Sequence, residues 1–154
     1  LASRPHSVLL DEPSPGLVAV ARRDILGAII RTVAGEGRTV LFSSHLLDEV
    51  ERVADDIAMI REGKVILYGT LEEIRAAHRR FPVRFDAPRA DAPDCAGVLH
   101  WEGADRDWTA FCGEDHEAAR ANIAASGGTI TEERTPSLED IFVARAGGRR
   151  PVPV

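Results

Sequence analysis

Hydrophobic residues alternate between short apolar runs and helical stripes along the first half of the chain. Residues 8–10 and 39–42 are apolar runs of the length expected for buried parallel strands. Between 22 and 34, apolar side chains recur every three or four residues, which predicts an amphipathic helix that ends at Gly35. A second such stripe predicts a helix after His45. Strand and helix in this order predict a parallel α/β sheet.

The pattern then changes to one that predicts an antiparallel hairpin. Two apolar runs, residues 57–60 and 65–68, flank a polar Arg-Glu-Gly-Lys turn. Thr70 and Glu73 have the spacing of a capping box, in which each side chain bonds the other residue's backbone N–H. They predict a helix that continues to about Ala77.

The character of the sequence changes near Arg80, where prolines and aspartates predict a looser stretch. The elements expected after it are strands around 98–101 and 108–112, a helix over 116–125, a strand over 129–131, and a short helix capped by Ser137 and Asp140 with Leu138, Ile141 and Phe142 inward. Two tryptophans in facing strands, Trp101 and Trp108, are expected in a core. This half is interpreted as a small α+β appendage.

Composition limits the class of protein. With 154 residues, 44% hydrophobic and 29% charged, the chain is typical of a soluble globular protein. A net charge of −6 argues against a nucleic-acid binder. Neither a membrane span nor a signal peptide is predicted. Cys95 and Cys112 lack metal-type spacing and are interpreted as reduced thiols. Because the chain starts at Leu1, we expect that it was processed or cut from a longer one.

Three polar residues are candidates for chemistry. Asp11 and Glu12 follow the first predicted strand, and His45 follows the second. The carboxyl ends of parallel strands share one edge of a sheet, where α/β proteins collect ligands. One acid could steady a magnesium ion, the other could take a proton from water, and the imidazole could donate to a phosphate oxygen. An acidic surface turn and a structural histidine remain alternatives from the residues alone.

At this point the sequence resembles the ABC-type ATPases. Residues 9–13 (Leu-Leu-Asp-Glu-Pro) look like their Walker B motif with its catalytic glutamate, and 14–17 look like the start of the D-loop. Residues 42–50 look like the switch-histidine region. Residues 54–65 look like the hairpin that follows this region, and residues 69–74 look like the usual end of the ATPase domain. The similarity covers about residues 1–78.

The resemblance implies a role for each matching residue. Asp11 would hold Mg²⁺ through water, Glu12 would act as general base, and His45 would sense the γ-phosphate of ATP. Ser14 and Gly16 would belong to the nucleotide site. The implied cofactors are ATP and Mg²⁺.

The resemblance also implies a domain organisation. Residues 1–79 would be the C-terminal part of a P-loop NTPase-like parallel sheet with flanking helices. Residues 80–146 would be the α+β appendage, which in the family mediates dimer contacts or regulation, and 147–154 are expected to be a disordered tail.

Residues 135–142 resemble the closing segment of exporter-type ATP subunits. This implies pairing with an ABC-2 type permease, a homo- or heterodimer of ATPase subunits, and a place on the cytoplasmic, inner face of the cell membrane. No nucleic acid is expected as a ligand.

The sequence departs from the family in several places. A phosphate loop needs glycines followed by Lys and Ser or Thr, yet the only Gly-Lys pair, Gly63-Lys64, lies in the predicted hairpin. The Q-loop and signature motif are also missing, and residues 126–128 (Ser-Gly-Gly) are rejected as a signature because they follow a helix. Val18-Ala19 stand where the D-loop aspartate is expected.

We therefore interpret the chain as a C-terminal fragment that does not bind ATP measurably by itself, because each lost phosphate contact lowers the affinity steeply. An apolar sheet edge would make it marginally soluble. The alternative is a non-catalytic interaction module that docks on a permease or on a complete ATPase. A chromosome-maintenance ATPase is disfavoured by the missing coiled coil and basic surface.

Overall fold

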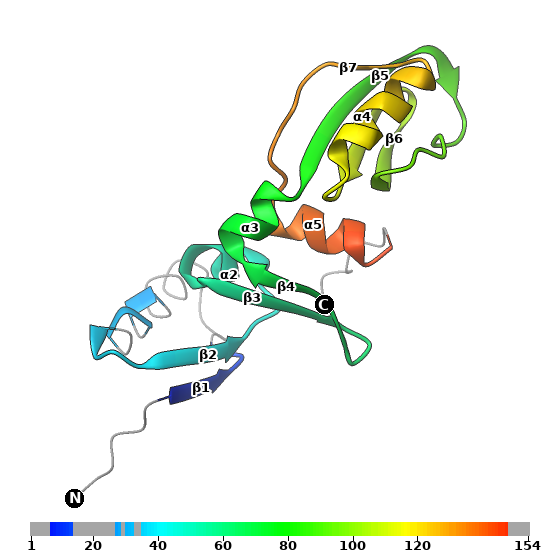
Figure 1. The fold of residues 1–154 in the computed structure, drawn as a ribbon. Coiled ribbons are helices and arrows are strands. Elements are labelled where there is room, and N and C mark those ends of the chain that lie inside the picture. The colour runs from blue at the N-terminus through cyan, green and yellow to red at the C-terminus, as the bar shows by residue number, and fades with distance from the viewer. Residues whose placement is uncertain (1–6, 14–26, 29, 33–34, 148–154) are drawn as a thin grey trace, which may run out of the picture. The chain divides into compact units, whose positions relative to one another are not determined.

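The computed structural model describes residues 7–13, 27–28, 30–32 and 35–147, which form mixed α/β structure (Figure 1). The elements are β1 (Ser7–Asp11), β2 (Thr39–Ser43), α2 (Leu47–Val53), β3 (Asp56–Arg61), β4 (Lys64–Thr70), α3 (Leu71–Ala76), β5 (Arg79–Arg89), β6 (Val98–Cys112), α4 (His116–Ala125), β7 (Gly128–Ile130) and α5 (Leu138–Arg145). The chain divides into two compact units, residues 1–54 and 55–154. The sequence-based boundary at 79/80 lies inside the second unit and stays a prediction.

In the first unit, β1 and β2 form a two-stranded parallel sheet. Both strands were expected from their apolar runs, and α2 follows as predicted. Their predicted burial is wrong for the described residues, because every residue of β1 and β2 is exposed or only half-buried. Residues 27–28, 30–32 and 35 are helical, while the rest of the helix predicted over 22–34 lies outside the described residues. The wider P-loop sheet around β1 and β2 stays a prediction.

The first unit exposes large apolar side chains. Leu9 and Leu41 are paired in register across β1 and β2, and they are 75% and 63% exposed. Uncovered apolar side chains on a small sheet favour association with other chains. This observation supports the expectation of marginal solubility, which stays a prediction.

In the second unit, β3 and β4 form the predicted antiparallel hairpin. Glu62 and Gly63 make its two-residue turn with φ of 51° and 73°, the left-handed values that such tight turns need. Ile57 and Met59 point to the buried side of the hairpin. Lys64 therefore starts a strand after a turn and not a helix after a phosphate loop.

The capping box predicted for α3 is confirmed. The Thr70 hydroxyl accepts a hydrogen bond from the Glu73 N–H at 3.1 Å, and the Glu73 carboxylate accepts one from the Thr70 N–H at 3.1 Å. The hydrogen bonds that the Thr70 backbone N–H and the Thr70 hydroxyl donate to the Glu73 carboxylate lower the pKa of Glu73. The helix therefore begins where two local side chains specify it.

The looser stretch predicted after Arg80 is wrong up to residue 89. Residues 79–89 are β5, the central strand of the sheet with order β6-β5-β7. The carbonyl of Pro82 accepts a hydrogen bond from the Thr131 N–H at 2.9 Å, just beyond the end of β7. The backbone N and C=O of one strand residue point to the same side, so the donor that Pro82 lacks would face the side of β7, just outside the β5–β7 ladder that begins at Val83.

The segment β6 turns back on itself. The rings of His100 and Phe111 are 5.9 Å apart, whereas eleven residues of straight strand would separate them by roughly 36 Å. Trp101 and Trp108 likewise meet edge to face at 6.3 Å. Asp105, with φ of 54°, marks the reversal. The two arms of β6 correspond to the two strands predicted around 98–101 and 108–112.

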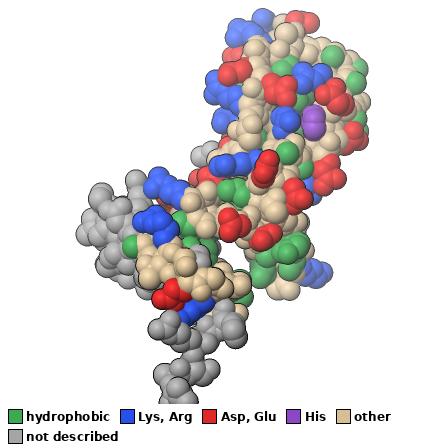
Figure 2. All heavy atoms as spheres, turned by 60° about the vertical axis from the view of Figure 1, so that its left-hand side comes forward, with side chains coloured by type: hydrophobic (Ala, Val, Ile, Leu, Met, Phe, Trp, Pro, Cys, Tyr) green, Lys and Arg blue, Asp and Glu red, His purple; other side chains and the backbone are tan. Residues whose placement is uncertain are grey.

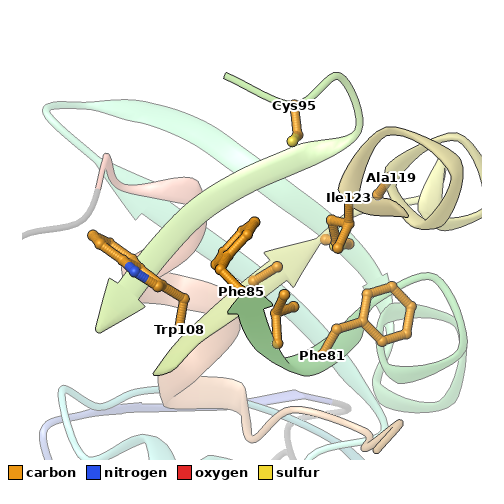
Figure 3. Close-up of a cluster of buried hydrophobic side chains, with 9 residues drawn as sticks. Phe81, Phe85, Cys95, Trp108, Ala119 and Ile123 are labelled. Carbon is orange, nitrogen blue, oxygen red and sulfur yellow. The ribbon is translucent and has the colours of Figure 1, made fainter. Parts of the chain in front are cut away.

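A buried apolar cluster fills the space between this sheet and α4 (Figure 3). Its members are Phe81, Val83, Phe85, Cys95, Trp108, Ala110, Cys112, Ala119 and Ile123. Trp101 packs against the cluster, so both tryptophans belong to the core as predicted. The two cysteines are free, and burial raises the pKa of the Cys112 thiol to about 12, which keeps it protonated.

The last helix, α5, also has its predicted capping box, between Ser137 and Asp140. Leu138 and Ile141 are buried as expected, but Phe142 is only half-buried. The tail was predicted over 147–154, and all of it except Gly147 lies outside the described residues. Among the helices of the described part, none is long and apolar enough to cross a membrane.

Acidic and basic side chains are interspersed over the face drawn in Figure 2. That face therefore presents no broad surface of a single charge.

His78 joins α3 to α5. Its ring is 2% exposed, its Nδ1 lies 2.6 Å from the Ile74 carbonyl oxygen, and its Nε2 lies 3.1 Å from the Arg145 Nε. The carbonyl only accepts and the guanidinium only donates, so Nδ1 carries the proton and Nε2 accepts. The imidazole is therefore neutral in the folded protein.

Arg79 strengthens the same junction. Its guanidinium donates to the carbonyls of Arg75, Ala76 and His78 at the end of α3. It also donates to the Glu133 carboxylate at 2.9 Å. The first residue of β5 thus closes the preceding helix and fixes the segment after β7.

We expect the second unit to lose stability as the pH falls below the ordinary histidine pKa of about 6.5. Burial lowers the pKa of His78, Arg145 lowers it further, and the Ile74 carbonyl and Glu114 oppose the shift. The unfolded chain therefore takes up a proton that the folded chain does not, so acid favours unfolding from this pKa down to the folded one.

Denaturant unfolding monitored by tryptophan fluorescence at about pH 7.5 and about pH 5.5 measures the effect. His78→Gln should flatten the pH dependence, whereas His45→Gln, in the other unit, should not. An unchanged pH dependence in His78→Gln would contradict the assignment.

Candidate functional site

The polar residues that follow β1 and β2 meet at the carboxyl ends of these strands. Asp11 lies opposite Ser43 in the parallel register. Glu12 and His45, the next candidates along each strand, are in contact, with 2.9 Å between the Glu12 Oε2 and the His45 Nδ1. The structure therefore brings together the three residues that the sequence predicted at one edge.

Ser43 connects Asp11 to Glu12. Its hydroxyl donates to the Asp11 Oδ1 at 2.6 Å and accepts from the Glu12 backbone N–H at 3.0 Å. Sequence reasoning missed this residue, because a serine before a histidine has no chemical signature of its own. The signal was the register: a polar residue that ends β2 must lie beside the residue that ends β1.

The backbone of Glu12 adopts an uncommon conformation. Its φ is 44°, in the left-handed region that side chains other than glycine seldom enter. Such residues cluster at functional sites, where surrounding contacts hold them. Glu12 is held at two points, by Ser43 at its N–H and by His45 at its carboxylate.

The Glu12 and His45 side chains are accessible to a ligand, with 43% and 75% of their surfaces exposed. At this exposure an ion pair by itself contributes little to stability. A carboxylate held against an imidazole can position a water molecule and accept its proton. The arrangement is therefore better suited to chemistry than to stabilising the fold.

The Asp11 carboxylate, which Ser43 holds at Oδ1, could hold Mg²⁺ through water. Mg²⁺ prefers oxygen ligands and is commonly held by one or two carboxylates, with several waters retained. A single carboxylate that acts through water matches that preference.

The remaining residues of the predicted motifs are either outside the described part of the chain or at the end of α4. Ser14, Gly16 and Val18-Ala19 lie outside the described residues. Ser126 follows α4 directly, and Gly127 adopts a left-handed φ of 80° there. This agrees with the interpretation of residues 126–128 as a helix end and not a nucleotide-contacting motif.

No family model matches the sequence. Similar curated proteins include the ABC transporter ATP-binding protein YtrB of Bacillus subtilis, 26% identical over 149 residues that make up 97% of this chain and 51% of the relative. The Nod factor export ATP-binding protein I of Rhizobium leguminosarum is 30% identical over 152 residues, 96% of this chain and 48% of the relative. The ABC transporter ATP-binding protein NatA of Bacillus subtilis is 37% identical over 75 residues, 49% of this chain and 30% of the relative.

The chain thus spans about half the length of the curated relatives that it matches from end to end. YtrB and the Nod factor export protein each align with nearly the whole chain, so the chain is similar from end to end to part of an ABC transporter ATP-binding protein.

Proposed function

We propose that this chain is part of an ATP-hydrolysing subunit of an ABC-type export system. It would supply the residues for hydrolysis that follow β1 and β2. The observation that supports the proposal most directly is the contact between Glu12 and His45, 2.9 Å apart beside Asp11 at the ends of two parallel strands. In phosphoryl transfer, catalysis consists mostly of positioning and charge stabilisation, which such an edge can provide.

The proposed roles follow from the chemistry of each side chain. Glu12 is the general base that orients the attacking water, and His45 contacts the γ-phosphate and holds the Glu12 carboxylate. Asp11 is the residue that would hold Mg²⁺ through water. When bound, the ion would neutralise charge on the phosphate oxygens. Ser14 and Gly16 are proposed to contact the nucleotide.

The wider organisation is also part of the proposal. Residues 1–79 would complete a P-loop NTPase-like parallel sheet whose phosphate loop comes from another part of the polypeptide. Residues 80–146 would form the accessory domain.

The export role is supported by one relative, which is named as a Nod factor export ATP-binding protein. We propose an ABC-2 type permease and a second ATPase subunit, identical or related, as partners. The subunit would then lie on the cytoplasmic face of the cell membrane, bound through the permease.

The test is ATP hydrolysis by the subunit expressed from its complete gene. We expect Mg²⁺-dependent hydrolysis, and we expect His45→Ala to lower kcat roughly a hundredfold, the effect of removing one donor to developing charge. His100→Ala is the matched control, because this histidine stacks on Phe111 in the other unit and should change kcat little.

Calorimetry with residues 1–154 alone should show no measurable Mg-ATP binding. Micromolar binding by this chain would contradict the affinity argument. Absence of Mg²⁺-dependent hydrolysis by the wild-type subunit would instead support the non-catalytic interaction module. An active wild type whose kcat is unaffected by His45→Ala would contradict the role proposed for His45.

A further inference from the structure

We infer that Ser43 is a positioning residue of this site, which locks the Asp11 carboxylate and the Glu12 backbone to each other through one hydroxyl. The inference rests on the proposed function for its catalytic consequence. Its structural part concerns only the described residues at the ends of β1 and β2.

The direction of both hydrogen bonds is set by the groups involved. A backbone N–H only donates and an ionised carboxylate only accepts, while a serine hydroxyl has a single proton. Ser43 therefore gives its proton to the Asp11 Oδ1, 2.6 Å away, and accepts from the Glu12 N–H, 3.0 Å away. The hydroxyl donates its one proton to Asp11 and uses a lone pair of its oxygen to accept from Glu12. The two hydrogen bonds are therefore compatible, and each strengthens the other.

The contact with Asp11 fixes the carboxylate. Its length is that of a charge-assisted O–H···O⁻ bond, the stronger kind of hydrogen bond in proteins. Since this hydrogen bond uses Oδ1, the second carboxylate oxygen, Oδ2, is the one that would accept from a metal-bound water. Ser43 thus orients the Asp11 carboxylate and leaves one carboxylate oxygen for the metal-bound water.

The contact with Glu12 holds a backbone that would otherwise relax. Glu12 has a φ of 44°, which its own side chain disfavours. The Ser43 oxygen accepts from the N–H of this same residue, while the carboxylate of Glu12 reaches His45 at 2.9 Å. Loss of the hydroxyl would free the backbone and misdirect the carboxylate, although neither charged residue is altered.

Ser43→Ala in the subunit from the complete gene tests the catalytic consequence. We expect kcat for Mg-ATP hydrolysis to fall roughly ten- to hundredfold, because two hydrogen bonds that include a charged group are lost. KM for Mg-ATP should change less than about threefold, because nucleotide binding depends on other contacts. Ser43→Thr keeps the hydroxyl at an exposed position and should recover most of the activity.

Ser44→Ala is the matched control. Ser44 is the adjacent serine, but its hydroxyl accepts from the Leu46 N–H at 3.1 Å. It should therefore keep kcat within about twofold, since no hydrogen bond to the charged site residues is lost. Wild-type hydrolysis with unchanged kcat in Ser43→Ala would overturn the inference and leave the proposed function intact.

Amide hydrogen exchange of residues 1–154 tests the positioning role of Ser43 separately from the proposed function. In Ser43→Ala, the Glu12 amide should exchange at least about tenfold faster than in the wild type or in Ser44→Ala. Unchanged exchange at Glu12 would overturn the inference even if the wild-type subunit hydrolyses ATP. Absence of hydrolysis by the wild type would remove the proposed function, while the exchange result still decides the structural role of Ser43.

Discussion

Glu12→Gln is expected to lower kcat for Mg-ATP hydrolysis by about two to four orders of magnitude, the range for removal of a general base. Glutamine keeps the shape of the side chain and can still contact His45, 2.9 Å away in the wild type. It cannot accept a proton from water at neutral pH. Hydrolysis by the complete-gene subunit, measured at saturating Mg-ATP, gives the effect, while KM should change little.

Glu36→Gln is the matched control, because Glu36 belongs to the same unit and pairs with Arg38 at 2.7 Å, before the first residue of β2 and not at its carboxyl end. A surface ion pair of this kind contributes little, so kcat should stay within about twofold. If Glu12 and His45 act together in one catalytic step, kcat of the double variant Glu12→Gln with His45→Ala should be scarcely lower than kcat of Glu12→Gln alone. Multiplied effects in the double variant would contradict a shared role.

Phe81→Ala is expected to lower the free energy of unfolding of the second unit by about 3–5 kcal/mol. The Phe81 side chain is fully buried and belongs to the cluster in Figure 3, and the Arg120 guanidinium lies 5.0 Å from its ring centroid. Truncation removes both the packing and this cation–π contact. A loss of this size is a large part of the stability of a small domain.

The chain supplies its own probe for this measurement. Its two tryptophans, Trp101 and Trp108, both belong to the core of the second unit, so fluorescence-monitored denaturation follows that unit alone. Tyr68→Ala is the matched control: this aromatic residue of β4 is 73% exposed and its loss should cost less than about 0.5 kcal/mol. Equal destabilisation by the two substitutions would show that the cluster is not the source of stability.

Local signals were predictable from the sequence. The capping boxes at Thr70 and Ser137 specify their helices through residues three positions apart, and both are confirmed. The hairpin turn at Glu62 and Gly63 is specified in the same way. In these places all the residues that form the interaction are neighbours in the sequence, so the local pattern is enough to predict it.

The central strand β5 was missed because its signal is not local. Pro82 and Pro88 are typical of loops, and single-sequence patterns weigh them heavily. Pairing with β6 on one side and β7 on the other outweighs that preference. The paired residues are sixteen positions apart for Arg89 and Asp105 and farther apart for the others, so a short window of sequence does not contain both partners.

At the candidate site, the meeting of Glu12 with His45 followed from the rule for parallel strands. Neither the left-handed backbone of Glu12 nor the bridging hydroxyl of Ser43 did, because both depend on how the chain turns after β1. The predicted roles of these residues, and those of Ser14 and Gly16, stay predictions.

The junction between α3 and β5 has a mechanical consequence. Only Ala77 and His78 separate the helix from the strand, and Arg79 binds the helix carbonyls and Glu133 with the same guanidinium. The Arg145 contact to His78 adds a second support on α5. We therefore expect α3 and the β6-β5-β7 sheet to move together, because these contacts hold in place the short connection at which a hinge would have to bend.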